Sequence, residues 1–215
     1  MQITVLYDNE GDVALKLGWG FSCLVDAHGK RILFDTGDNG DALVFNMEKL
    51  SVDIPSIDAL FVSHGHRDHC GGIKKFLEKR GRLPVFAPAS ARPGLQPFQG
   101  QADLNWITDS AEILPGFYTT GEMKGIEQSL VVQREGGNAV ICGCAHPGVD
   151  NILRKAGEYG KVSMIAGGFH GFDKLEMLKD LEIIMPCHCT AHKQKILDMY
   201  PDTARSCSSG TTIEL

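Results

Sequence analysis

The sequence lacks a long run of apolar residues, although 43% of its 215 residues are hydrophobic. A membrane-spanning helix needs roughly 20 consecutive apolar residues, so we expect no membrane span. The first residues, 1–7 (MQITVLY), lack the basic start of a signal peptide and are typical of a β-strand. We therefore expect a cytoplasmic protein that folds as one domain over residues 1–215.

Concentrated positive charge is also missing. The formal net charge is -6, and the lysines and arginines are scattered along the chain. Nucleic-acid binding needs clustered Lys and Arg that face phosphates, so we expect no nucleic-acid partner. The chain has neither a P-loop nor the glycine pattern of a dinucleotide-binding fold, so nucleotide cofactors are not indicated. The expected partner is a small-molecule substrate, and the oligomeric state is left open.

The cysteines do not form an even set, because the chain has seven of them. Since no export signal is expected, reduced thiols are the natural state of such a chain. We therefore predict no disulfides and expect most of the cysteines to be small buried apolar side chains.

Apolar residues recur with the periods of strands and helices. Strands are predicted at residues 2–7, 22–25, 31–34, 57–62, 84–87, 130–132, 139–142, 162–166 and 182–186, with further strands around 106–107 and 117–118 and near the C-terminus. Helices are predicted at residues 41–50, 73–79, 149–158, 173–180 and 191–199, and residues 88–104 are predicted to be a loop. Each half has hairpin strands followed by alternating helices and strands, which predicts two packed sheets with helices on the outer faces.

The strongest chemical signal is the segment SHGHRDH at residues 63–69, directly after an apolar strand. Period-two alternation places His64 and His66 on one side of an extended chain, where they can share a metal ion. Asp68 and His69 lie past the strand end and are expected to face a neighbouring metal position. Imidazoles with a carboxylate suit zinc, iron or manganese. The alternative is a solvated polar loop that happens to contain histidines.

The same residues resemble a known family. The pattern His-x-His-x-Asp-His at 64–69 resembles the signature of the metallo-β-lactamase superfamily, and LFDTG at 33–37 resembles its first motif. The chain also resembles one subgroup of this superfamily. The subgroup includes the dihydropterin methyl ribofuranosylaminobenzene phosphate synthase of methanopterin biosynthesis. The matching segments are GFS at 20–22, FDTG at 34–37, SHGH at 63–66, GCAHPG at 143–148, GGFH at 167–170 and PCHCT at 186–190.

The resemblance implies a fold and a set of metal ligands. The fold is α/β, an αββα four-layer sandwich of two mixed β-sheets with helices on the outer faces. The implied metal ligands are His64, His66, Asp68, His69, His146 and His188. Asp35 is implied to orient the metal-binding loop rather than to bind metal. The cofactor is then one or two divalent metal ions, with zinc the first choice and manganese, iron or magnesium as alternatives.

The chain departs from the superfamily pattern at two places. There is no histidine between His69 and His146, and Glu127 stands roughly where the third-motif histidine is expected. The bridging aspartate expected after the strand at 139–142 is also missing, because the chain continues there as GCAH. We therefore keep Glu127 as a candidate ligand, and we predict weaker binding of a second metal.

Some histidines and cysteines leave alternatives open. His170 follows a strand end and two glycines, so we predict a catalytic or substrate-contacting residue, with helix capping as the alternative. Cys142 and Cys144 with Cys187 and Cys189 offer a rival structural zinc or iron–sulfur site. Strand alternation opposes it, because it turns both Cys187 and Cys189 away from His188. His28 and His192 are predicted to be solvated.

These residues predict a metal-dependent hydrolase that uses a metal-bound hydroxide on a small, anionic or phosphorylated substrate. Asp68 is expected either to bind metal or to accept a proton. A synthase or transferase that acts on a pterin-like or ribose-phosphate-like substrate is the first alternative. A non-catalytic Cys/His metal or redox module is the second.

Overall fold

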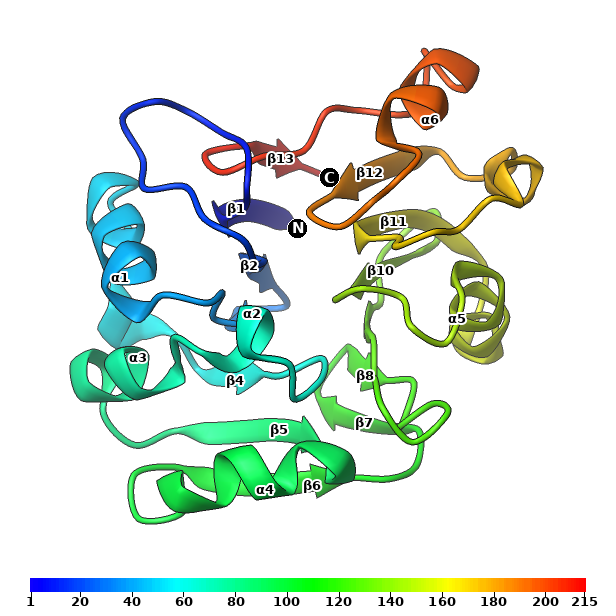
Figure 1. Cartoon of the computed structure of the whole chain (residues 1–215). Coiled ribbons are helices and arrows are strands. Elements are labelled where there is room, and N and C mark those ends of the chain that lie inside the picture. The colour runs from blue at the N-terminus through cyan, green and yellow to red at the C-terminus, as the bar shows by residue number, and fades with distance from the viewer.

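The computed structural model describes residues 1–215, and two mixed β-sheets face each other at its centre (Figure 1). The first sheet has the order β13-β1-β2-β3-β4-β5-β6: Thr212–Glu214, Gln2–Tyr7, Ser22–Ala27, Lys30–Phe34, Ala59–Phe61, Pro84–Pro88 and Asp103–Ile107. The second has the order β12-β11-β10-β9-β8-β7: Ile183–Cys187, Val162–Gly168, Asn138–Cys142, Leu130–Val132, Phe117–Thr119 and Ala111–Leu114.

Helices cover the outer face of each sheet. In Figure 1, α1 and α3 lie outside the first sheet, and α5 lies outside the second. The helices are α1 Gly40–Lys49, α2 Arg67–Cys70, α3 Ile73–Arg80, α4 Arg92–Leu95, α5 Val149–Ala156 and α6 Lys193–Met199. Short 3-10 segments lie at Ile54–Ser56, Ala89–Ala91, Gln96–Phe98, Gly157–Tyr159 and Leu175–Leu178.

Alternation along the central strands builds three separate cores. In β3 and β4, Phe34 and Phe61 face the space between the sheets, while Leu33 faces the helices of the first sheet. In β10, Ile141 faces the same central space and Val140 packs toward α5. Parallel strands buried on both faces need such unbroken apolar runs. The layers are therefore helix, sheet, sheet, helix, which confirms the predicted fold class.

Local sequence explains where α1 begins and ends. The side chain of Asn39 accepts hydrogen bonds from the amides of Asp41 and Ala42, which caps the first turn. Buried apolar side chains lie on one face of the helix, and Lys49 in its last turn complements the helix dipole. The helix predicted at 41–50 is therefore confirmed almost residue for residue.

Two predicted elements are wrong. Residues 88–104 are not a loop: Ala89–Ala91, α4 and Gln96–Phe98 form helical turns, and β6 begins at Asp103. Prolines at the first positions of these turns suit helix starts, and the buried Leu95 anchors them to the core. The helix predicted at 173–180 is only the 3-10 segment Leu175–Leu178, whose two buried leucines are three residues apart, the period of a 3-10 turn.

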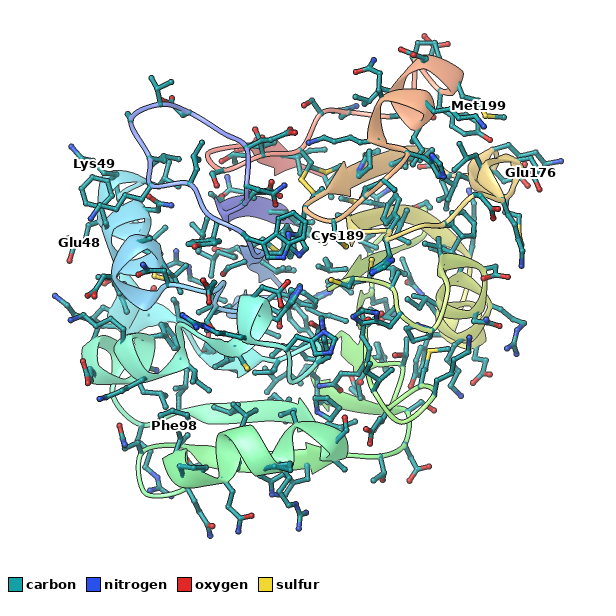
Figure 2. The ribbon with its side chains drawn as sticks, in the orientation of Figure 1. Glu48, Lys49, Phe98, Glu176, Cys189 and Met199 are labelled. Atoms are coloured by element: carbon teal, nitrogen blue, oxygen red, sulfur yellow. A yellow bond between two sulfur atoms is a disulfide. The ribbon has the colours of Figure 1, made fainter.

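The prediction of reduced thiols throughout is also wrong, because Cys187 and Cys207 form a disulfide (Figure 2). A bridge between Ile184 and Ala204 brings the segment before β13 alongside β12, which places the two cysteines together. The other five cysteines are free: Cys23, Cys70, Cys142, Cys144 and Cys189. No helix of the structure is long and apolar enough to cross a membrane.

Candidate metal centre

The candidate metal centre lies where the carboxyl ends of parallel strands from both sheets meet. The strand pair β3 and β4 is parallel, and so are β10, β11 and β12. The segment after β4 carries residues 64–69, and the segments after β10, β11 and β12 carry His146, His170 and His188. Ligand sites of α/β folds form at such strand ends, so the topology alone explains why residues far apart in sequence gather here.

Three histidine rings form one side of the centre. The ring centroids of His64 and His66 lie 4.6 Å apart, and each lies 4.9 Å from the ring of His146. The donor atoms of His64, Cys144 and His146 all lie within 4.8 Å of one another. His64 is buried and His66 is exposed. The three rings thus converge as the sequence predicts, and their role as ligands of one metal stays a prediction.

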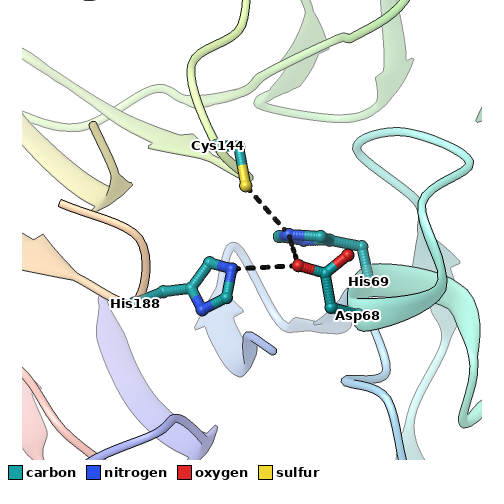
Figure 3. Close-up of side chains that lie close together, drawn as sticks. All are labelled: Asp68, His69, Cys144 and His188. Carbon is teal, nitrogen blue, oxygen red and sulfur yellow. Dashed lines mark hydrogen bonds and ion pairs between the residues drawn. The ribbon is translucent and has the colours of Figure 1, made fainter. Parts of the chain in front are cut away.

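A second group lies beside the first (Figure 3). Nε2 of His188 lies 3.3 Å from Oδ2 of Asp68, and Nε2 of His69 lies 3.7 Å from the same oxygen. The sulfur of Cys144 lies 3.1 Å from Nε2 of His69. The sequence predicts the grouping of Asp68, His69 and His188. It does not predict Cys144 here, although this residue follows the strand after which the superfamily places its bridging aspartate.

The ring nitrogens at these positions are suited to a metal ion. Nε2 of His64 and Nε2 of His146 are buried without any hydrogen-bond partner in the protein, and Nε2 of His188 has only the carboxylate of Asp68 beside it, at 3.3 Å. Leaving a buried polar atom unpaired costs roughly 1–3 kcal/mol, so the two unpaired nitrogens on neighbouring rings indicate a missing partner. Neutral imidazole nitrogens with a carboxylate are good donors for divalent zinc. The residues present therefore fit a divalent metal.

The electrostatics of the centre also favour metal binding. Burial and the neighbouring His66 lower the pKa of His146 to about 4, and burial with the other histidines lowers the pKa of His64 even further. Metal competes with protons for imidazole nitrogen, and these two rings are uncharged at neutral pH, so each has one nitrogen free to bind metal. Burial opposes ionisation of Asp68, but hydrogen bonding to His188 and the charge of His69 lower its pKa overall, to about 2.

Asp35 holds the histidine loop without joining either group. Its carboxylate accepts hydrogen bonds from the amide and hydroxyl of Ser63 at 2.7 and 2.6 Å, and from Nδ1 of His69 at 2.7 Å. It is fully buried in a left-handed conformation with φ 54°. Burial by itself would lower the pKa of His69, but the Asp35 carboxylate raises it overall. With Nδ1 donating to Asp35, the Nε2 lone pair of His69 points toward the centre.

Glu127 has a different role from the candidate ligand considered in the sequence. Its Oε1 accepts hydrogen bonds from the amides of Gly143, Cys144 and Ala145 at 3.0, 3.1 and 3.0 Å. Its Oε2 accepts from the amide of His146 at 2.8 Å. Burial raises the pKa of Glu127, against the effect of these amides. Both oxygens are therefore used to hold the backbone of residues 143–146, and the proposal of a metal ligand here is wrong.

Three further residues position His188, and the sequence analysis missed them. His188 has φ 47°, and its amide donates to Asp8 at 3.0 Å. Its Nδ1 lies 3.0 Å from Oδ1 of Asn9, to which it donates when Nε2 faces the metal position. The ring of Trp19 lies 4.8 Å from its ring. Asp8 and Asn9 directly follow β1, and Trp19 lies later in the segment that joins β1 to β2.

His170 lies at the edge of the centre. It is exposed, with φ 46°, and its ring lies 5.3 Å from that of His146. Together with Phe169 and Phe172 it lines a pocket of about 430 Å³ next to His146. The next helical segment begins only at Leu175, so His170 does not cap a helix. Its predicted substrate role stays a prediction. His28 is exposed, as predicted, His192 is half-buried, and both lie outside the two groups.

The rival cluster of four cysteines does not form. Cys187 is bonded to Cys207, and the thiol of Cys142 donates to the carbonyls of Ala166 and Gly168 in a fully buried position. Only Cys144 and Cys189 stay near the histidines. The alternation argument is therefore right for Cys187, and a site with all four thiols is wrong.

Comparison with known proteins agrees with this geometry. The profile of the Metallo-beta-lactamase superfamily matches residues 18–170. The chain is 26% identical to the 7,8-dihydropterin-6-methyl-4-(beta-D-ribofuranosyl)-aminobenzene-5'-phosphate synthase of Methanocaldococcus jannaschii, over 85% of this chain and 83% of that protein. The structure of Tm1679, described as a metal-dependent hydrolase of the beta-lactamase superfamily, superposes with a TM-score of 0.78 and 26% identity. That match covers 100% of this chain and 99% of the other.

Zn²⁺-bound PqqB from Methylobacterium extorquens shares the fold with a TM-score of 0.69 and 11% identity, over 100% of both chains. The matching profile spans most of the chain, and the two-sheet architecture with its histidines at the strand ends accounts for the match. The chain belongs to the metallo-β-lactamase superfamily.

Proposed function

We propose that the chain is a metal-dependent hydrolase of a small anionic substrate. The observation that carries the proposal is the presence of two adjoining groups of donor atoms, with buried, unpaired Nε2 atoms on His64 and His146 in one and His188 beside Asp68 in the other. A divalent metal, when bound there, acts as a Lewis acid and makes hydroxide available near neutral pH. Zinc is the first choice because histidine and carboxylate donors dominate, with manganese, iron and magnesium as alternatives.

Asp68 and His170 have different roles beside the metal. Asp68, whose pKa is about 2, is ionised throughout the neutral range and is a poor proton acceptor. Its role is therefore to bind metal rather than to act as the general base. His170 is exposed at the pocket edge, where an imidazole can donate to a phosphate oxygen or pass a proton to a leaving group.

The anionic character of the substrate rests on two supports. The exposed imidazole of His170 lines the pocket beside His146 and offers a hydrogen-bond donor to an anion. The relative from Methanocaldococcus jannaschii is named for a phosphate product, and it covers most of this chain. The same relative favours a second candidate function, a synthase or transferase that acts on a pterin-like or ribose-phosphate-like substrate.

Turnover in isotopically labelled water separates the two candidates. The metal-loaded protein is incubated with a panel of phosphomonoesters, phosphodiesters and other small esters in ¹⁸O-water. Hydrolysis places one labelled oxygen in a product, whereas transfer to a second substrate does not. His28→Ala is the matched control, because this exposed histidine lies outside the centre.

Removal of the metal by a chelator should abolish turnover, and addition of zinc should restore it. Activity that survives complete removal of metal would reject both candidates. Metal binding without turnover on either type of substrate would instead support a non-catalytic module.

A further inference from the structure

Cys144 is the only residue that belongs to both groups of the centre. Its sulfur lies within 4.8 Å of the donor atoms of His64 and His146, and within the same distance of those of Asp68, His69 and His188. Figure 3 shows it pointing from the segment after β10 toward His69. The sulfur therefore lies between the two candidate metal positions, whereas each histidine faces only one of them.

The backbone around Cys144 is fixed on both sides. Glu127 accepts hydrogen bonds from four consecutive amides, those of residues 143–146. A Cβ atom on Gly143 would lie 2.2 Å from Oγ of Ser63, and one on Gly168 would lie 2.6 Å from the carbonyl oxygen of Gly143. Residues 143–146 are therefore closely packed between the end of β4 and the end of β11. The backbone at position 144 therefore cannot move away from the centre without breaking these contacts.

The local hydrogen bonding indicates that Cys144 faces a lone pair rather than a donor. His69 uses Nδ1 to donate to Asp35, so its Nε2 is an acceptor in the neutral ring. In that tautomer the thiol of Cys144, 3.1 Å away, can donate to this nitrogen, and the sulfur of Cys189 is its other hydrogen-bond partner. A metal ion between the two atoms would replace this proton, which leaves to solvent as the thiolate binds.

We propose that the sulfur of Cys144 is a ligand shared by the two metal positions, so that a thiolate replaces the bridging carboxylate that the superfamily pattern places after this strand. The first position is completed by His64, His66 and His146, and the second by Asp68, His69 and His188. The inference rests on the proposed metal-dependent function only for the presence of metal. It replaces the expectation that the second metal binds weakly, because the missing bridge is supplied by sulfur.

The neighbouring Cys189 provides a matched control. It is half-buried and lies against the same segment, since a Cβ on Gly168 would meet its sulfur at 2.7 Å and Cα of Cys144 at 3.3 Å. Its sulfur belongs to neither group. Replacement of Cys189 thus removes a less buried thiol that is in hydrogen-bond contact with Cys144, and it leaves the proposed ligand in the chain.

The test is cobalt substitution of the full chain, with absorption spectra and bound metal measured during titration of the metal-free protein. The wild type and Cys189→Ser should bind two equivalents and show a thiolate-to-cobalt charge-transfer band that grows with both. Cys144→Ser should lose the band and at least tenfold in affinity for one equivalent. Cys144→Asp should lose the band and keep two equivalents, because it supplies a bridging carboxylate.

A band that persists in Cys144→Ser, or that disappears in Cys189→Ser, would overturn the inference. So would full binding of two equivalents by Cys144→Ser with unchanged affinities. If Cys144→Ser does not fold, the band in Cys144→Asp decides alone, since its loss supports the ligand and its persistence rejects it. A protein that shows the band but hydrolyses nothing would reject the proposed function and leave the sulfur ligand standing.

Discussion

The two sheets contribute to the metal centre in opposite ways. The first sheet supplies four of the proposed donors from one short segment, residues 64–69, and a buried carboxylate, Asp35, contacts a donor side chain directly. The second sheet supplies Cys144 and His146 after β10 and His188 after β12, and its buried carboxylate, Glu127, contacts only backbone amides. One half is therefore organised through side chains and the other through the main chain, which predicts different consequences when each carboxylate is changed.

The largest effect is expected for Glu127→Gln. Glutamine has a single carbonyl oxygen, so its amide group faces at least one of the four N–H donors and leaves it unpaired in a buried position. We expect the free energy of unfolding of the metal-free protein to fall by about 3 kcal/mol, measured by urea titration. Glu135→Gln, at an exposed hairpin residue, is the control and should change little. An unchanged unfolding midpoint in Glu127→Gln would contradict the main-chain role.

His170→Ala tests whether the second-sheet half also contacts substrate. We expect metal content and thermal stability close to wild type, because His170 is exposed and belongs to neither group. Turnover should fall about a hundredfold, as for a lost acid–base group. Loss of a stoichiometric metal ion would make His170 a ligand instead. Unchanged turnover on the true substrate would return it to a structural role.

Asp35→Asn tests the side-chain contacts that support the donors of the first sheet. An asparagine cannot accept from both Ser63 and His69 as the carboxylate does, so His69 loses its fixed orientation. Metal affinity should fall roughly 10–100-fold, as is typical when a partner of a ligand histidine is removed. The cobalt spectrum of the saturated protein should keep its ligand set. Loss of an oxygen donor from that spectrum would show that Asp35 itself binds metal.

The smallest effect is expected for Asn9→Ala. Nδ1 of His188 loses its acceptor at 3.0 Å, but the amide of His188 keeps its bond to Asp8. We expect about a tenfold loss in affinity at the second metal position and none at the first, the lower end of the range for such partners. Competition titration with a chromophoric chelator measures both. Equal loss at both positions would show that the two sites are not separately supported.

The sequence predicts the two-sheet fold and the grouping of six donors because those features depend on local patterns. Apolar runs identify β3, β4, β10 and β11. Residues 64–69 are recognisable as a metal-binding segment because three histidines and an aspartate lie within six residues. The prediction fails where the outcome depends on contacts between distant segments. The disulfide of Cys187 joins a strand to a segment whose approach is set by β12 and β13. The helical turns at 89–98 depend on prolines at turn starts and on Leu95 reaching the core.

The roles of Glu127 and Cys144 have the same explanation. The sequence position of Glu127 suggests a donor to metal and gives no sign of the four amides whose hydrogen bonds it accepts. The sequence position of Cys144 suggests a thiol cluster, because nothing in its neighbours places it beside His69 and His64 at once. Whether one side chain can reach two metal positions depends on how the two sheets pack against each other, so the sequence of either sheet alone does not predict it.

Anomalous diffraction from crystals of the zinc-loaded protein tests the proposal that Cys144 joins two metal positions. We expect two zinc peaks, one among His64, His66 and His146 and the other among Asp68, His69 and His188. Each should lie about 2.3 Å from the sulfur of Cys144, the usual zinc–thiolate distance. A single peak, a peak outside these residues, or two peaks with the sulfur bound to neither would contradict it.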